Sequence, residues 1–315
     1  MRKLFVTAAV VLVSVFVLAQ ESFARTLIVN TFGGAGKYTT IGAAHADATN
    51  SDVISVQYGQ GTYRGAIITK GVKILAASPG INIDLPGSAV SGRSVGFHVI
   101  DVKGVRIQGF QFRNLDLPIY AEGTQGLIVN GNTLNYAVQA VTLWDCRGSN
   151  IVNNLINNLR STNKGGGLGV FVGSSSVGIS LNNKVQHNWV AGQVNGGGAA
   201  YWTAGIALYG EPASEENSGN KVLSNTVALS GPAQLAGVML DQYAKLPNCV
   251  VENNQVKNNQ LKNVAFKLVE NPQGLSAACG NDVSGNVLQS KLLGGAVEVF
   301  PEPVSSGGTS LIRPF

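Results

Sequence analysis

The chain has 315 residues, of which 40 are glycine and only 12% are charged. Its 22 Lys and Arg against 17 Asp and Glu give a formal net charge of +5. Such sparse, weakly basic charge argues against a disordered tail and against a nucleic-acid-binding surface of clustered Lys and Arg. It is compatible with an acidic polysaccharide or a cell-surface glycan as partner.

Residues 1–24 have the pattern of a signal peptide. Arg2 and Lys3 precede an apolar run from Phe5 to Ala19, and small residues around Ala24 suit a cleavage site. The run is too short for a comfortable membrane span, so we expect cleavage, no transmembrane segment afterwards, and a secreted or periplasmic protein. Roughly 291 residues (315 minus 24) remain, and we expect them to form one monomeric domain, 25–315.

Residues 25 to about 60 are predicted to form a cap. Thr26–Asn30 and Val53–Val56 have the composition of strands, and the small-residue segment Ala43–Ala48 between them has helical potential.

A six-residue pattern recurs through the predicted coils, about 61–300, which a tail, 301–315, follows. An aliphatic residue, two free positions, Asn, one free position and another aliphatic residue occur six times, and a degenerate copy has Phe110 in place of Asn. A recurring unit with insertions is typical of a solenoid, in which each repeat contacts mainly its neighbours. The six Asn are Asn132, Asn154, Asn188, Asn225, Asn254 and Asn286.

The recurrent Asn has a structural interpretation. Asn tolerates left-handed backbone at a sharp turn, and its amide both donates and accepts hydrogen bonds. Stacked at the same turn of successive coils, these residues would form a buried ladder. The alternative is a row of sugar-binding amides.

A second strand follows most copies, as in Ala140–Leu143, Gly205–Leu208 and Gly237–Leu240. Each coil then supplies two or three short strands to separate parallel sheets, with aliphatic residues alternating inward. The sequence therefore predicts an all-β, single-stranded right-handed parallel β-helix with an N-terminal α-helical cap.

The opening of the chain carries a resemblance to a known superfamily. The order Tyr38–Ile41, a small-residue helix, Asp52–Val56, Gly61–Arg64 and Val72–Ile74 resembles the start of secreted parallel β-helix proteins of the pectin lyase-like superfamily. The resemblance implies enzymes acting on acidic polysaccharides, chiefly lyases and C5 epimerases. It marks a superfamily and not one activity.

The residues that follow the second strands are the candidate site. If the coils stack in register, they form a strip of aromatic, acidic and basic groups that could bind sugar rings and their substituents. The alternative is an ordinary polar turn on each coil. The substrate-binding candidates are Tyr120, Glu122, Trp144, Asp145, Trp202, Tyr209 and Glu211.

A lyase or epimerase must neutralise a uronate carboxylate and remove the C5 proton. The catalytic candidates are Asp241, as a Ca²⁺ ligand or a protonated contact, Tyr243 or Lys245 as the base, and Arg147. The identity of any metal stays open. Adjacent aspartates, typical of inverting hydrolases with this fold, do not occur in the sequence.

A noncatalytic solenoid that binds glycan through Trp144, Tyr201 and Trp202 is the second hypothesis. The two hypotheses differ in whether the candidate catalytic residues converge in one cleft.

Cys249 and Cys279 lie 30 residues apart, close to the local repeat length, which would allow a disulfide in an oxidising compartment. Their offsets from the following repeat Asn differ, so the pairing stays open. Cys146 is then the unpaired cysteine, expected to be a small buried side chain rather than a reactive thiol.

Overall fold

The computed structural model describes residues 24–34, 37–161, 166–195, 202–211, 216–231, 234–242, 249–262, 264, 266–270 and 279–289. Residues 1–23 of the predicted signal peptide and the predicted tail, 301–315, lie outside the described residues. Within the described part, no helix is long and apolar enough to cross a membrane.

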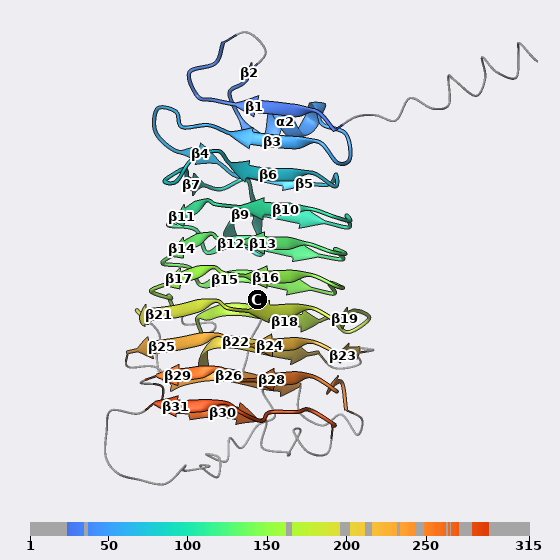
Figure 1. Ribbon diagram of the computed structural model, residues 1–315, viewed down its shortest axis with the longest axis vertical. Helices are drawn as coiled ribbons and strands as arrows, with labels where there is room; N and C mark the ends of the chain where they lie inside the picture. Colours follow the sequence, from blue (N-terminus) through green and yellow to red (C-terminus); the bar gives the residue numbers. More distant parts are fainter. Residues whose placement is uncertain are drawn as a thin grey trace, which may run out of the picture.

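The fold is a right-handed parallel β-helix whose coils stack along one long axis (Figure 1). Three long sheets run along this axis, and all their strand pairs are parallel except one hairpin pair. The predicted solenoid is thereby confirmed.

Sheet A lists its strands in the order β2 (Lys37–Tyr38), β1 (Thr26–Val29), β3 (Val53–Val56), β6 (Lys73–Ala76), β10 (Arg106–Gln108), β13 (Ile128–Asn130), β16 (Asn150–Val152), β20 (Lys184–Gln186), β24 (Lys221–Leu223) and β28 (Gln255–Lys257). Sheet B has the order β31 (Val287–Gln289), β29 (Gln260–Lys262), β25 (Thr226–Ser230), β21 (Trp189–Gln193), β17 (Leu155–Asn157), β14 (Thr133–Asn135), β11 (Gln111–Arg113), β7 (Asn82–Leu85) and β4 (Tyr63–Arg64).

Sheet C has the order β30 (Phe266–Glu270), β26 (Gln234–Gln242), β22 (Trp202–Gly210), β18 (Leu168–Ser174), β15 (Gln139–Trp144), β12 (Leu117–Glu122), β9 (Arg93–Ile100) and β5 (Ala66–Ile68), with β8 (Ser88–Val90) paired antiparallel to β9. The short sheet D is formed by β19 (Ile179–Leu181), β23 (Glu216–Ser218) and β27 (Val251–Glu252).

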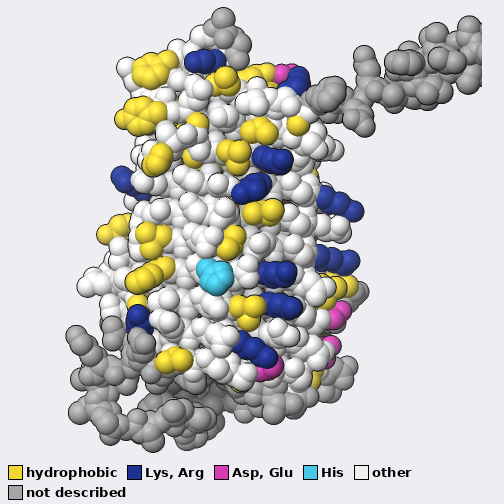
Figure 2. All heavy atoms as spheres, viewed as in Figure 1, with side chains coloured by type: hydrophobic (Ala, Val, Ile, Leu, Met, Phe, Trp, Pro, Cys, Tyr) yellow, Lys and Arg dark blue, Asp and Glu magenta, His cyan; other side chains and the backbone are white. Residues whose placement is uncertain are grey.

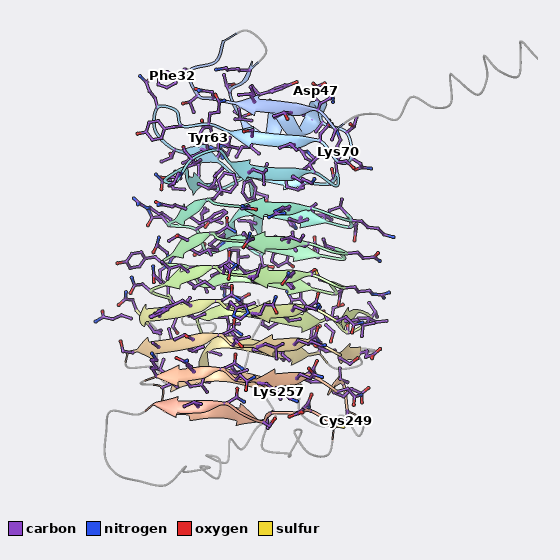
Figure 3. All side chains as sticks on the ribbon, viewed as in Figure 1. Phe32, Asp47, Tyr63, Lys70, Cys249 and Lys257 are labelled. Atoms are coloured by element: carbon purple, nitrogen blue, oxygen red, sulfur yellow. A yellow bond between two sulfur atoms is a disulfide. The ribbon has the colours of Figure 1, made fainter. Side chains whose placement is uncertain are left out.

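The cap contains the helix α2 (Ile41–Asp47), which lies beside β1 and β3 (Figure 1). Thr40 caps its N-terminus by accepting a hydrogen bond from the Ala43 N–H at 3.1 Å. At the other end Lys70, labelled in Figure 3, donates from Nζ to the carbonyl oxygens of His45, Ala46 and Ala48. A cation at a helix C-terminus is stabilised by the helix dipole and satisfies carbonyls that lack helical partners.

The turn between sheets A and B contains a buried asparagine ladder. At each step the Oδ1 atom of one Asn accepts from the backbone N–H and from Nδ2 of the Asn one coil earlier, at 2.9 to 3.1 Å. Phe110 starts the ladder by donating its backbone N–H to Asn132. The members are Asn132, Asn154, Asn188, Asn225, Asn259 and Asn286.

A second asparagine ladder lies at the other end of the sheet A strands, where its residues Asn183, Asn220 and Asn254 directly precede β20, β24 and β28. It runs through Asn183, Asn220, Asn254 and Asn281 with the same paired bonds, at 2.9 to 3.1 Å. Sequence analysis placed Asn254 in the first ladder. The structure places it in the second, because both ladders leave the same short pattern in the sequence.

The left-handed backbone of the A–B turn also lies one residue away from where the sequence analysis placed it. Positive φ angles occur at the residue that precedes each ladder Asn, such as Asn153, His187 and Ser224. The ladder Asn itself is therefore selected for its buried amide and not for its backbone freedom.

Glycine is required within strands β18 and β22 of sheet C, where neighbouring coils pack closely. A Cβ atom on Gly205 would lie 2.5 Å from a methyl of Val227 and 2.8 Å from the Gly237 carbonyl oxygen. A Cβ atom on Gly169, one coil earlier, would lie nearer still, at 2.3 Å from the Gly205 carbonyl oxygen. The glycine that begins the sequence segments Gly205–Leu208 and Gly237–Leu240 is explained by this close packing between coils.

Cys249 and Cys279 form a disulfide near the end of the described coils (Figure 3). Cys146 is a free thiol with no exposed surface, and burial raises its pKa to about 12. It is a packed side chain and not a nucleophile at neutral pH.

Candidate functional site

The outer face of sheet C brings part of the predicted strip into one column. Glu122 pairs with Trp144, Trp144 with Gly173, Gly173 with Tyr209, and Tyr209 with Asp241. Because the pairing is parallel and in register, these residues succeed one another at about 4.8 Å along the axis. We call this set the sheet C column; Tyr120 lies two residues before Glu122, in the neighbouring column.

The middle of the sheet C column is buried and not open. Trp144 is 8% exposed, Tyr209 2% and Asp241 1%. The Trp144 ring packs against Phe171 at 5.0 Å between centroids, and Phe171 against Tyr209 at 5.9 Å. Trp144 and Tyr209 therefore belong to an apolar cluster and do not present the free ring faces that the sequence analysis expected for sugar stacking.

Asp145 and Glu211 leave the strands at turns. The Asp145 carboxylate accepts hydrogen bonds from the Ser175 N–H at 2.8 Å and from the Ser175 hydroxyl at 2.6 Å. Gly178 packs so closely on this carboxylate that a Cβ atom would overlap it. Asp145 thus anchors the turn after β18, while the half-buried Glu211 donates its backbone N–H to the Ser174 carbonyl.

Arg147 and Asp241 do not converge. Arg147 lies exposed at the corner after sheet C, where its backbone bridges to Gln125 and Leu181. Its coil contains Trp144, which is three steps of the column from Asp241, or about 14 Å along the axis. Tyr243, Lys245 and Tyr201 lie outside the described residues, as does the side chain of Trp202.

The N-terminal end of sheet C carries a polar cluster. His98 contacts the Glu122 carboxylate through Nε2 at 3.0 Å, and the Tyr120 hydroxyl donates to the same carboxylate at 3.4 Å. Burial, together with the Glu122 charge, raises the pKa of Tyr120 well above its ordinary value. Tyr120 is therefore a hydrogen-bond donor at neutral pH and not a base.

Within the described residues no group of three or more His, Cys, Asp or Glu side chains could hold a metal ion. His45 accepts the Thr69 N–H at 3.2 Å beneath the cap helix, and burial, followed by the charge of Lys70, lowers its pKa. His187 is exposed beside the ladder.

The outer face of sheet A carries a cationic surface that the sequence analysis did not single out. Lys73 pairs with Arg106, and Lys184 pairs with Lys221, each in direct register on neighbouring strands. The ten strands of this sheet contain no Asp or Glu. Figure 2 shows Lys and Arg side chains gathered on the face of the molecule that sheet A forms.

Two cations of this face have side-chain partners. Arg106 donates from Nε to the Gln108 side chain at 2.7 Å, and Lys257 forms an ion pair with Asp282 near the end of the sheet. Lys184 and Lys221 have no ion-pair partner among the described residues. Like charges on neighbouring strands repel each other, so the Lys184–Lys221 pair carries an unfavourable electrostatic energy. A bound anion would reduce this repulsion.

An exposed aromatic ring lies on sheet B, next to the first ladder. Trp189 follows the ladder residue Asn188 directly and is 50% exposed. The Lys262 ammonium lies 6.0 Å from its ring centroid. The cationic surface and the exposed ring could both have been found from their positions in the repeat. Lys184 and Lys221 directly precede an inward aliphatic residue, and Trp189 directly follows a ladder Asn.

These sheets define the architecture of a right-handed parallel β-helix protein. No family model matches the sequence, and no curated protein matches it.

The solved structures similar to this chain include the catalytic domain of a GH87 alpha-1,3-glucanase in complex with nigerose, with 13% identity over 85% of this chain and 70% of that chain and a TM-score of 0.36. An exopolygalacturonase from Thermotoga maritima has 11% identity, covers 78% of this chain and 91% of that chain, and has a TM-score of 0.35. An alginate lyase from Paenibacillus sp. has 15% identity, covers 84% and 98%, and has a TM-score of 0.31. None of these likenesses assigns an activity to this chain.

Proposed function

We propose that the protein is exported and binds an anionic, uronate-containing polysaccharide along the outer face of sheet A. The observation that carries this proposal is the pair of in-register cation stacks, Lys73 with Arg106 and Lys184 with Lys221, on a sheet whose strands contain no acidic residue.

The geometry of the stacks suits a linear polymer. Cations that repeat at the strand spacing of about 4.8 Å along a straight axis can face successive carboxylates of an extended chain. The stacks lie at two separate places along the sheet, because the intervening strands carry Ile128 and Asn150 in the same column. A polymer that contacts both stacks would gain from two weak sites on one ligand.

Neutral parts of a sugar also have partners on this side. Gln108, Asn130, Asn150, Gln186 and Gln255 lie in the strands of sheet A, and amides both donate to and accept from hydroxyl groups. The exposed ring of Trp189, across the first ladder, can stack on a sugar face.

Export is supported by the disulfide between Cys249 and Cys279, because disulfides persist mainly in oxidising compartments. The signal-peptide pattern at residues 1–24 also supports export.

Lyase or C5-epimerase chemistry is the second candidate. It is favoured by the register that aligns Asp241 with Tyr209 on sheet C, immediately before Tyr243 and Lys245 in the sequence. Arg147 would have no part in such a site, because it lies three coils away at another corner. Ultraviolet absorbance of unsaturated uronate ends would report lyase activity, and proton NMR of the polymer would report epimerisation.

Binding is tested by titrating the mature protein with polygalacturonate, alginate and a neutral glucan in isothermal calorimetry. Replacing Lys184 and Lys221 together by Gln removes two surface charge contacts, each worth about 0.2–1 kcal/mol. The affinity for the uronate polymers should fall by about 2- to 30-fold. Binding should also weaken as salt is raised.

The matched control replaces Arg64 and Arg113, two cations of sheet B, by Gln. This variant has the same net charge as the first but should bind as the unmodified protein does. Equal losses in the two variants, or binding to the neutral glucan with the same affinity, would refute a specific site on sheet A.

A further inference from the structure

A hairpin at the N-terminal end of sheet C holds a serine against a histidine. β8 folds back on β9 through the two-residue turn Ser91–Gly92, where both φ angles are positive, 47° and 76°. This geometry is typical of tight β-hairpins. The hairpin is fixed on the neighbouring coil by Gly87, where a Cβ atom would lie 2.2 Å from the Ala66 backbone nitrogen.

Ser88, His98 and Glu122 form a continuous hydrogen-bonded chain from three adjacent strands. The Ser88 hydroxyl lies 3.2 Å from His98 Nδ1, and His98 Nε2 lies 3.0 Å from Glu122 Oε1. A carboxylate only accepts, so it fixes the proton on Nε2. Nδ1 is then left to accept the proton of the serine hydroxyl.

The neighbouring residues hold the three side chains in place but leave Ser88 and Glu122 accessible to solvent. The His98 side chain is only 10% exposed and packs edge-on against the Tyr120 ring, at 5.1 Å between centroids. Tyr120 also donates to the second oxygen of Glu122, at 3.4 Å. The Glu122 side chain is 41% exposed, and Ser88 is half-buried, so a small substrate can approach the hydroxyl from solvent.

We propose that Ser88, His98 and Glu122 constitute a second site, in which Ser88 is the nucleophile, His98 the general base and Glu122 the positioning residue for hydrolysis of small carboxylic esters. The arrangement has the three roles of a serine hydrolase triad, with the two imidazole nitrogens exchanged. It is independent of polysaccharide binding on sheet A.

The reaction balances with groups that the chain and water supply. Ser88 Oγ attacks the ester carbonyl carbon while its proton passes to His98 Nδ1. The carbon–oxygen bond to the alcohol then breaks, and the alcohol oxygen leaves with that proton. Water, deprotonated by His98, hydrolyses the acyl-serine to give a carboxylic acid and free Ser88.

An apolar surface adjoins the serine and suits the acyl group. Ser88 pairs with the buried Val95, and Val90 of the same hairpin packs against the cluster that contains Val95, Leu117 and Tyr120. We therefore expect esters with a short apolar acyl chain, such as acetyl esters.

The test uses an alkyl fluorophosphonate, which reacts covalently with activated serines, and 4-nitrophenyl acetate as substrate. We expect one adduct per chain, located at Ser88 by peptide mass spectrometry, and hydrolysis that disappears in Ser88→Ala. Ser94→Ala is the matched control, because Ser94 lies on the same hairpin but its hydroxyl donates to Asp116. It should keep both the adduct and the hydrolysis.

His98→Ala should slow labelling by about 100-fold or more, the contribution typical of a general base, and added imidazole should restore part of the rate. Glu122→Gln keeps an acceptor oxygen but loses the charge, so labelling should slow while the thermal midpoint stays unchanged.

An unlabelled protein, or an adduct at another serine, would overturn the proposal. So would slowing without imidazole rescue, which would make His98 only an anchor of the hairpin. The adduct is mapped on the unmodified chain, so the position of labelling tests the proposal even if a variant fails to fold.

Discussion

Replacing Asn188 by Ala is expected to destabilise the β-helix strongly. The Asn188 Nδ2 group donates to the carbonyls of Ile151 and Gln186 and to Asn225 Oδ1, at 2.8, 3.1 and 3.0 Å. Its Oδ1 accepts from the backbone N–H and Nδ2 of Asn154, both at 3.0 Å. Alanine removes these bonds and leaves buried groups unpaired at about 1–3 kcal/mol each, so we expect a loss of about 3–6 kcal/mol.

Urea unfolding monitored by circular dichroism measures this loss. Asn130→Ala is the control, because the Asn130 side chain in sheet A has, among the described residues, a single long hydrogen bond, at 3.5 Å, with Asn153. Surface substitutions of this kind usually change stability by less than about 0.5 kcal/mol. A loss below about 1 kcal/mol in Asn188→Ala, or equal losses in the two variants, would refute the view that the ladder holds the coils together.

Three further outcomes are expected. Gly205→Ala should lower stability by about 1–3 kcal/mol, measured by urea unfolding, because its methyl would overlap Val227, and a neutral result would contradict the close packing between coils. Reducing the bond between Cys249 and Cys279 should destabilise by about 3–4 kcal/mol, since it closes a loop of 30 residues, and an unchanged thermal midpoint in dithiothreitol would contradict this. Burial opposes ionisation of Asp52, but hydrogen bonds from Thr49 and Arg25 hold its pKa well below the ordinary 3.8, so its contribution is complete above that pH and is lost on acidification below it. Asp52→Asn should remove this part of the acid dependence, and an unchanged acid midpoint would argue against it.

The fold could be predicted because its determinants are local and repeated. Inward aliphatic residues such as Val185 and Val222 recur once per coil. The Asn that stands between the two aliphatic residues of each pattern has few roles other than bonding in a buried turn. The cap helix was visible as a run of small residues, and its strands begin and end within a residue or two of the predicted bounds.

The site was less predictable for a geometric reason. Sequence alone does not show which outward residues of sheet C are covered, so Trp144 and Tyr209 were expected to be open and are buried. Arg147 was grouped with Asp241 by its offset from the second strand, although stacking separates the two by three coils.

Asn254 shows a different limit of the sequence. Asn254 and Asn259 are five residues apart and both follow aliphatic residues, and only their bonding partners in neighbouring coils distinguish the two ladders. The cationic stacks were missed for a similar reason, because Lys184 and Lys221 are 37 residues apart in the sequence and become neighbours only through the register of sheet A.

The two ladders also determine how such a chain can change length. In four coils the ladder residues stand five positions apart, at Asn183 and Asn188, Asn220 and Asn225, Asn254 and Asn259, and Asn281 and Asn286. The strand between them therefore has a fixed length, whereas the steps from one coil to the next vary. A coil inserted or deleted as a whole unit, from one ladder pair to the next, would present the same two amides to its new neighbours. The β-helix can thus be lengthened or shortened by recombination between coils without redesigning the interface between them.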